Sequence, residues 1–148
     1  MIDSGKAMGF RMVYRDLVLS GSLTTVFRPG RAKYEELYKP GKVVQGAIIR
    51  QPGSPEDGQE REIDPVFTGD EISLRIKSQK KVLLKNLRPV DFFGSSPDVK
   101  DEQDLIYHLG MIYNQPASSF SPNTIIIRIE LEYLSVKGEN YENNPAAD

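Results

Sequence analysis

The sequence predicts an α+β domain, a small β-barrel of about five to six mostly antiparallel strands with two helices. Short β-branched segments are separated by turn residues at modest intervals, which favours a small barrel. Two further segments carry apolar residues at helical spacing. The chain has 148 residues, 39% of them hydrophobic, and a chain of this length forms one core without disulfide support.

The first part of the chain predicts a strand, a helix and a second strand. Phe10–Val13 suits a short strand, and Tyr14–Ser20 repeats its apolar residues at helical spacing. Gly21 follows at the position of a helix C-terminal cap. Thr24–Arg28 is rich in β-branched and aromatic residues, which is typical of a strand, and the turn at Pro29–Gly30 ends it.

The next segments predict a connection, a buried strand and a loop. Arg31–Tyr38 is a polar connection with room for one helical turn. Lys39–Gly41 contains a Pro-Gly turn signal and leads into Lys42–Arg50, whose apolar residues suit a largely buried strand. Gln51–Glu62 is rich in Pro, Gly and charge, which predicts an exposed loop.

A β-hairpin is predicted after this loop. Glu71–Lys77 alternates apolar and polar residues, as a half-buried strand does. The polar residues Ser78–Lys80 predict a turn into a second strand, Val82–Leu87, which Pro89 prevents from continuing.

The last part of the chain predicts a helix and a long strand. Ser95–Asp98 offers capping hydroxyls before Pro97, the pattern of a helix start, and Asn114–Pro116 ends that helix. Its apolar face consists of Leu105, Ile106, Leu109, Ile112 and Tyr113. Thr124–Leu134 alternates cleanly and is the strongest strand. We expect one domain over residues 1–135 and a disordered tail over residues 136–148.

The composition excludes several classes of function. The chain has no cysteine and one histidine, so disulfides, thiolate chemistry and a zinc site are not expected, nor is any other metal or cofactor. No apolar run is long enough to span a membrane, and the N-terminus lacks the apolar stretch of a secretory signal. We therefore expect a cytoplasmic protein.

The charge is unevenly distributed along the chain. Residues 1–50 hold nine Lys or Arg against four Asp or Glu, whereas residues 51–148 hold ten against seventeen. A basic first third can meet phosphate groups, although solvated charges can also segregate without a partner. A duplex-DNA binder is usually far more basic than this chain, so duplex DNA is not an expected partner.

Four landmarks in order make the chain similar to a known family. They are Gly21–Arg28 (GSLTTVFR), the turn and strand start at Tyr38–Val43, the helix end at Leu109–Tyr113 and the final strand at Ile125–Leu134. Over roughly residues 10–134 this order resembles the ASCH domain family of the PUA-like superfamily. The resemblance implies a PUA-like barrel and a cleft that binds RNA or a modified nucleotide.

The first landmark has a readable physical logic. Gly21 lets the backbone turn from helix into strand without a side chain in the cleft. Thr24 and Arg28 then share one face of the strand with Val26. If that face lines the cleft, Arg28 offers a planar, multi-donor cation to a phosphate or a base edge. The alternative is that Arg28 only pairs with a carboxylate.

The chain departs from the family at the residues of its known reaction. Small bacterial members of the superfamily hydrolyse N4-acetylcytidine with a lysine two residues after the glycine and a threonine three residues further on. This sequence has Leu23 and Val26 there, which supply neither a base nor a hydroxyl. The third partner, a glutamate, falls near Asp98, Asp101 or Glu102. These departures from the family pattern argue against this activity.

Two further groups of residues are weighed as candidates. His108 lies one turn after Asp104 and is placed on the polar side of its helix, with a catalytic role not expected. Met8, Met12 and Met111 are interpreted as packing residues.

An aromatic and basic cluster completes the predicted site. Tyr34 and Tyr38 are flanked by four cations and either stack a base or form an ordinary loop with two half-buried tyrosines. The predicted nucleotide-binding residues are Gly21, Ser22, Thr24, Arg28, Arg31, Lys33, Tyr34, Lys39 and Lys42.

The leading hypothesis is a domain that binds RNA or a modified nucleotide with these residues. The alternatives are an enzyme on acylated nucleosides with a rebuilt site, and a protein-interaction module that uses an exposed barrel edge. The oligomeric state is left open.

Overall fold

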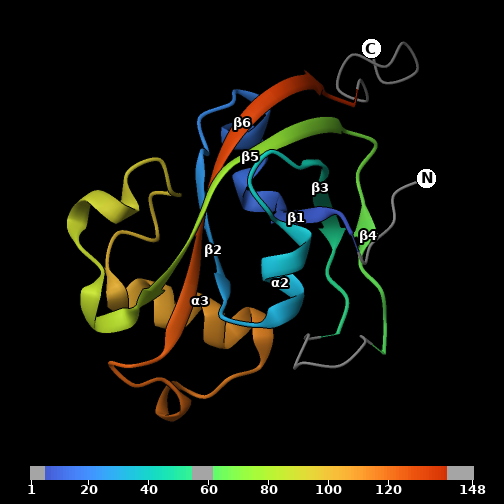
Figure 1. The fold of residues 1–148 in the computed structure, drawn as a ribbon. Coiled ribbons are helices and arrows are strands. Elements are labelled where there is room, and N and C mark those ends of the chain that lie inside the picture. The colour runs from blue at the N-terminus through green and yellow to red at the C-terminus, as the bar shows by residue number, and fades with distance from the viewer. Residues whose placement is uncertain (1–5, 55–61, 140–148) are drawn as a thin grey trace.

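The protein folds around a mixed β-sheet that curls into a half-barrel (Figure 1). The computed structural model describes residues 6–54 and 62–139. The strands are β1 (Met8–Arg11), β2 (Thr25–Pro29), β3 (Val43–Gln51), β4 (Val66–Phe67), β5 (Glu71–Leu83) and β6 (Ile125–Lys137). Their order across the sheet is β1-β3-β5-β6-β2, with β4 beside β3, and only the β1–β3 pair is parallel. The predicted α+β fold on a small barrel is confirmed.

Short helices fill and close this half-barrel. They are α1 (Arg15–Leu19), α2 (Ala32–Leu37) and α3 (Glu102–Tyr113), with the 3-10 turns η1 (Met12–Tyr14), η2 (Leu84–Asn86), η3 (Pro89–Phe92) and η4 (Ala117–Ser119). The α2 helix stands where the sequence predicted a polar connection, because it buries Tyr34 and Tyr38 in the core. Among the described residues, no helix has the length and apolarity needed to cross a membrane.

The predicted turn at Ser78–Lys80 is wrong, because β5 runs through it without interruption. It pairs with β6 from Glu71 to Leu83, with register shifts that include one between Ile76 and Ser78. The polar side chains there have partners: Ser78 Oγ donates to Glu130, and Gln79 Nε2 donates to two carbonyls of the α2 segment. A polar stretch with neither Gly nor Pro was therefore misread as a turn.

The predicted start of the last helix at Ser95–Asp98 is also wrong. The α3 helix begins at Glu102, and its N-cap is Asp101, whose carboxylate accepts a hydrogen bond from the Asp104 N–H. Ser95 uses its hydroxyl on the Val99 carbonyl instead, inside the preceding loop. The helix ends as predicted, at Asn114 in the left-handed conformation.

Other boundaries differ by a few residues. The first strand ends at Arg11, and β6 continues through Lys137, two residues into the segment predicted as a tail. Gly21 and Gly41 have positive φ angles of 72° and 86°, which confirms both as turn positions. Of the predicted loop Gln51–Glu62, residues 55–61 lie outside the described residues, as do residues 140–148 of the predicted tail.

The core lies inside the curve of the sheet. Met8, Ile48, Leu74, Ile127 and Ile129 are fully buried there, as the sequence pattern required. Met12 and Met111 are instead 42% and 45% exposed, so the packing role predicted for them is wrong.

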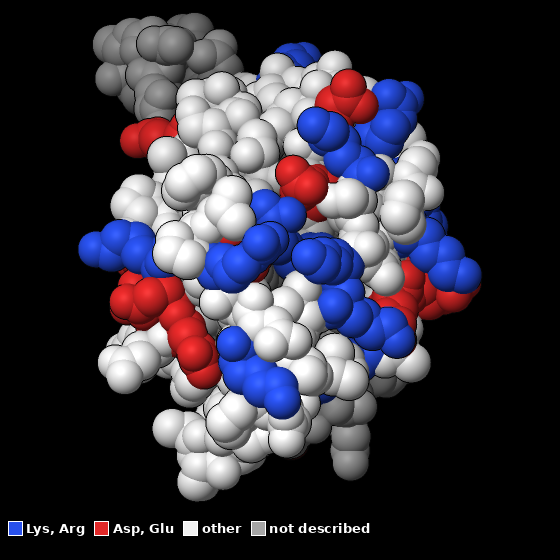
Figure 2. Space-filling view, turned by 60° about the vertical axis from the view of Figure 1, so that its left-hand side comes forward, with Lys and Arg blue, Asp and Glu red and all other residues white. Residues whose placement is uncertain are grey.

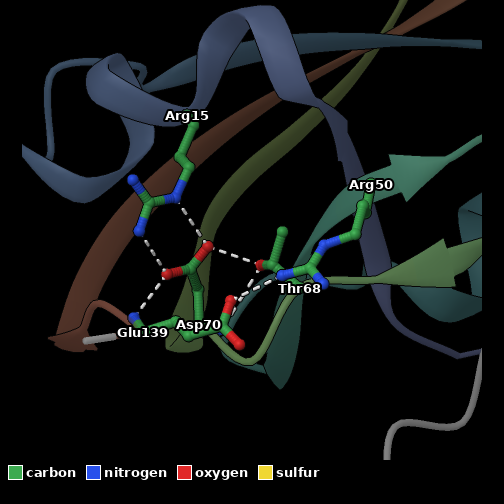
Figure 3. Close-up of polar contacts among 5 residues, drawn as sticks. All are labelled: Arg15, Arg50, Thr68, Asp70 and Glu139. Atoms are coloured by element: carbon green, nitrogen blue, oxygen red, sulfur yellow. Dashed lines mark hydrogen bonds and ion pairs between the residues drawn. The ribbon is translucent and has the colours of Figure 1, made fainter. Parts of the chain in front are cut away.

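A buried ion pair fastens α1 to the start of β5 (Figure 3). Arg15 donates from Nε and Nη2 to the two carboxylate oxygens of Asp70, at 2.9 and 2.8 Å. The same carboxylate accepts hydrogen bonds from the Thr68 hydroxyl and from the Glu139 N–H. Arg50 on β3 pairs with the Glu139 side chain, so the network also holds the chain that follows β6.

Candidate functional site

A cavity opens where the sheet fails to close into a full barrel. The two edges of the sheet are β1 and β2, and the cavity lies between them under α3, with a volume of about 100 Å³. Its apolar walls are Phe10, Leu23, Val26, Phe27, Val99, Leu105, Leu109 and Ile112. Its polar lining comes from Arg11, Tyr14, Thr25, Arg28, Ser95, Ser96, His108 and Tyr113. Mostly apolar walls with a few polar groups are typical of small-ligand sites.

Backbone groups of the edge strands also face this cavity. Along an antiparallel strand, backbone groups point alternately to the partner strand and away from it. The Thr25 N–H donates to the Gly94 carbonyl, and the Phe27 carbonyl accepts from Arg28 Nη1 at 2.9 Å. The backbone of Thr25 and Phe27 is therefore turned away from β6, toward the open edge.

Arg28 is the predicted site residue that lines the cavity. Its Nη2 donates to the Gly9 carbonyl of β1 at 3.2 Å, so the guanidinium bridges the two unpaired edges. No carboxylate pairs with Arg28 within the described residues. A guanidinium has five donors, so those not used on the two carbonyls and on the Tyr38 hydroxyl can serve a ligand.

Tyr34 and Tyr38 belong to a buried cluster behind Arg28. They are 4% and 3% exposed, and Tyr34 also meets the ring of Tyr113 edge-on. Burial is the largest cause that raises the pKa of Tyr34 and of Tyr38, so both phenols stay neutral. Neither ring offers a free face for a base, so the interpretation as a stacking platform does not fit the structure.

Two of the predicted cations cover this tyrosine cluster. The guanidinium of Arg31 lies over the Tyr113 ring at 5.4 Å, and Lys33 Nζ lies over the Tyr34 ring at 5.2 Å. They bring positive charge close to Arg28, but neither lines the cavity.

The other predicted residues lie away from the cavity. Gly21 packs against the ring of Tyr133, and the Ser22 hydroxyl bonds to Ser20. Thr24 contacts Gly94.

The two lysines at the turn before β3 are engaged elsewhere. Lys39 forms an exposed ion pair with Glu36, and Lys42 donates to the Glu36 carbonyl. The structure thus gathers Arg28, Arg31, Lys33 and Tyr34 in one region and leaves the remaining predicted residues outside it.

Leu23 and Val26 are part of the cavity wall. They are 4% and 8% exposed. The two positions where the resembling family carries its lysine and threonine therefore do face the cavity, but here they present only hydrocarbon. A base or a nucleophile at these positions is absent.

A polar cluster that sequence reasoning missed lies beside the cavity. The Tyr14 hydroxyl donates to the carboxylate of Asp98 at 2.8 and 2.9 Å, and the same carboxylate lies 3.4 Å from His108 Nε2. Burial disfavours the Asp98 charge, but hydrogen bonds from Tyr14 and Ser96 outweigh it and lower the pKa of this carboxyl. His108 is 9% exposed, so its predicted place on the polar side of the helix is wrong.

Helical spacing could have found this histidine. His108 lies three residues after Leu105 and four before Ile112, which puts it on the apolar face of α3. Its closeness to Asp98 could not be predicted, because the loop before α3 was misread as the start of the helix. Within residues 6–54 and 62–139, no three His, Asp or Glu side chains gather as metal ligands.

The fold and the cavity define an α+β half-barrel domain with a small site between its two edge strands. Neither a protein-family profile nor a curated protein matches the chain. Among solved structures, it is similar to protein EF3133 from Enterococcus faecalis V583, described as DUF984. The two are 12% identical with a TM-score of 0.55, and the match covers 94% of this chain and 80% of that one. At this identity the likeness shows the fold alone.

Proposed function

We propose that the protein is an ASCH-like domain that binds a nucleotide, free or within RNA, with the base in the cavity between β1 and β2. The order of landmarks from Gly21 to Leu134 supports the ASCH-like assignment, and the half-barrel is compatible with it. The observation that carries the nucleotide is the position of Arg28, a cation without a carboxylate partner in a cavity with mostly apolar walls.

The cavity suits a flat ligand with a polar edge. A base removed from its stack gains by burying its faces against apolar or aromatic side chains and by hydrogen bonds to its edge. Phe10, Phe27 and Val26 provide the faces, and Arg28 with the edge of β2 provides donors and acceptors. Arg11, which also lines the cavity, adds a second cation for a phosphate.

The first test compares ligand binding by the unmodified protein with binding by a variant whose cavity is blocked. Isothermal titration with the common nucleosides, their monophosphates and N4-acetylcytidine is expected to find at least one ligand. Ile112→Trp is expected to abolish that binding, because residue 112 lines the cavity from α3 and a larger ring fills it.

Met111→Trp is the matched control. Met111 is adjacent to Ile112, but its side chain is exposed and does not line the cavity, so binding should be unchanged. Equal binding by both variants, or no binding by the unmodified protein, would refute the proposal.

The cluster of Tyr14, Asp98 and His108 favours a second candidate, an acid–base enzyme on an acylated nucleoside. A base oriented by a carboxylate beside a ligand cavity is the arrangement that hydrolysis requires. His108 would take a proton from water as its oxygen adds to the acyl carbon, and would return that proton to the departing amine. Arg28 would stabilise the negative charge on the acyl oxygen.

This candidate predicts turnover that depends on one residue. Incubation with N4-acetylcytidine should release cytidine and acetate, observed by mass analysis, and His108→Gln should lower the rate by about 100-fold or more. Met111→Gln, which changes an exposed residue of α3 that does not line the cavity, should leave the rate unchanged. Absence of turnover, or equal turnover by the two variants, would leave binding as the function.

A further inference from the structure

A positively charged segment begins on β5, outside the cavity. From Ile72 to Val90 the sequence holds six Lys or Arg and no acidic residue. This segment covers most of β5 and continues through η2 to the start of η3. Figure 2 shows Lys and Arg side chains gathered across the middle of the face that carries these elements, with some acidic side chains beside and between them.

Part of this charge is neutralised within the protein. Arg75 pairs with Glu132, and Lys81 pairs with Glu35 of α2. Arg128 pairs with Glu130, and its side chain is only 13% exposed. Lys80 and Lys85 are exposed, and neither forms an ion pair or a side-chain hydrogen bond within the described part of the chain. Two lysines on this surface are therefore available to a partner.

The strand register gathers further cations around Arg128. Lys80 lies directly opposite Arg128 in the β5–β6 pair, so the two side chains share one face of the sheet. Arg128 Nε donates to the Asp91 carbonyl at the end of η3, and Arg88, at the start of η3, lies 3.9 Å from the Asp91 carboxylate. Arg128 is thus held by the protein itself, and we call the exposed Lys80, Lys85 and Arg88 the basic strip.

An exposed aromatic side chain follows η3 close to the cavity rim. Phe93 directly follows η3 and is 69% exposed. Its carbonyl accepts a hydrogen bond from the Thr25 hydroxyl, and Thr25 lines the cavity. Arg128 Nη2 approaches the same hydroxyl at 3.4 Å, so Thr25 joins the backbone of Phe93 to Arg128, which lies opposite Lys80 in the β5–β6 pair.

Cations that follow a surface beside an open aromatic face are the elements of single-strand recognition. Phosphates meet the cations while bases stack on the ring. The sequence suggested this combination at Tyr34 and Tyr38, but those rings are buried. Phe93, with Lys85 and Arg88 a few residues before it, has the exposure that stacking needs.

We propose that the basic strip binds the phosphate backbone of single-stranded RNA, with one base stacked on Phe93 and the strand directed to the cavity. This inference rests on the proposed nucleotide site only in so far as the RNA strand is directed to the cavity. A duplex does not fit it, because stacking on Phe93 needs an unpaired base.

The test compares matched pairs of lysine substitutions. Binding of a 12-nucleotide oligouridine is followed by fluorescence anisotropy between 50 and 300 mM salt. Each lost phosphate contact reduces the slope of log K against log salt by about 0.7. Lys80→Ala with Lys85→Ala should therefore reduce the slope by about 1.4. Lys6→Ala with Lys137→Ala removes the same charge from exposed lysines elsewhere and should leave the slope unchanged.

Phe93→Ala tests the aromatic part of the proposal. Stacking of one base is worth about 1–3 kcal/mol, so affinity for oligouridine should fall roughly 5- to 150-fold with little change in slope. Because Phe93 is exposed, its removal leaves the core intact, which circular dichroism can verify.

The outcomes separate this inference from the proposed function. If a mononucleotide binds but the two lysine pairs have equal effects on oligouridine, the inference is wrong and the nucleotide site stands. If no mononucleotide binds while the strip pair alone lowers the slope, the inference holds and the proposed cavity ligand is wrong. If polyglutamate competes as well as oligouridine and Phe93→Ala has no effect, the strip serves an acidic protein and the inference is overturned.

Discussion

Replacing Asp70 by alanine is expected to lower the free energy of unfolding by about 3–5 kcal/mol, because it removes one member of the buried ion pair with Arg15. The Asp70 side chain is fully buried, and the Arg15 side chain is 10% exposed. The substitution also removes the acceptor for Thr68 and for the Glu139 N–H. Urea unfolding followed by circular dichroism measures the change.

Two control variants isolate the broken ion pair as the cause. Glu132→Ala removes one partner of an exposed ion pair with Arg75 and should cost no more than about 1 kcal/mol. Replacing Arg15 by Met and Asp70 by Leu together removes both charges and should cost much less than Asp70→Ala alone. A double variant as unstable as the single one would show that packing, rather than the charge, determines the loss.

The same carboxylate makes stability depend on acid pH. Burial disfavours the charge of Asp70, but hydrogen bonds from Arg15, Thr68 and Glu139 outweigh this and lower its pKa to about 2. A folded-state pKa below the unfolded value of about 3.9 adds stability that is fully present above pH 4. That stability is lost as the pH falls from about 4 to 2. Asp70→Asn should remove this part of the pH dependence.

The strands were predictable to the extent that their periodicity decides their position. Thr24–Arg28, Lys42–Arg50 and the last strand agree with β2, β3 and β6 within a few residues, because one buried face forces alternation. The prediction of a turn at Ser78–Lys80 failed because no periodic pattern marks these residues as a strand. These residues owe their extended form to pairing with β6 and to hydrogen bonds from Ser78 and Gln79, which are tertiary contacts.

In the candidate site, too, some residues could be placed from local sequence patterns, whereas others are brought together only by the fold. Strand alternation put Arg28 on the same face as Val26, and the family resemblance implied that this face lines a cleft. Both residues line the cavity, but so do Thr25 and Phe27 of the other face. For Tyr34 the sequence left a stacking platform and an ordinary loop open, because a polar neighbourhood in sequence says little about burial on a short helix such as α2. The meeting of Tyr14, Asp98 and His108 joins residues up to 94 positions apart, so only the folded chain reveals it.

Arg28→Met is expected to weaken the binding of a nucleotide by roughly 10- to 150-fold, because charge-assisted hydrogen bonds contribute about 1.5–3 kcal/mol. Arg28→Lys should recover only part of the affinity, since an ammonium keeps the charge but lacks the planar fork of donors. Isothermal titration with the tightest-binding monophosphate measures both effects.

The structural role of Arg28 must be separated from its role in binding. Its guanidinium also ties β1 to β2 through the Gly9 and Phe27 carbonyls, so part of any loss can come from a looser cavity. Thermal unfolding of the ligand-free variants measures that part, and Arg75→Met, which changes an exposed arginine on β5, provides the baseline. A direct contact requires that affinity fall while the melting temperature without ligand stays close to that of the unmodified protein. If the two decline together, and Arg28→Lys restores both, then Arg28 positions the strands and other donors in the cavity hold the ligand.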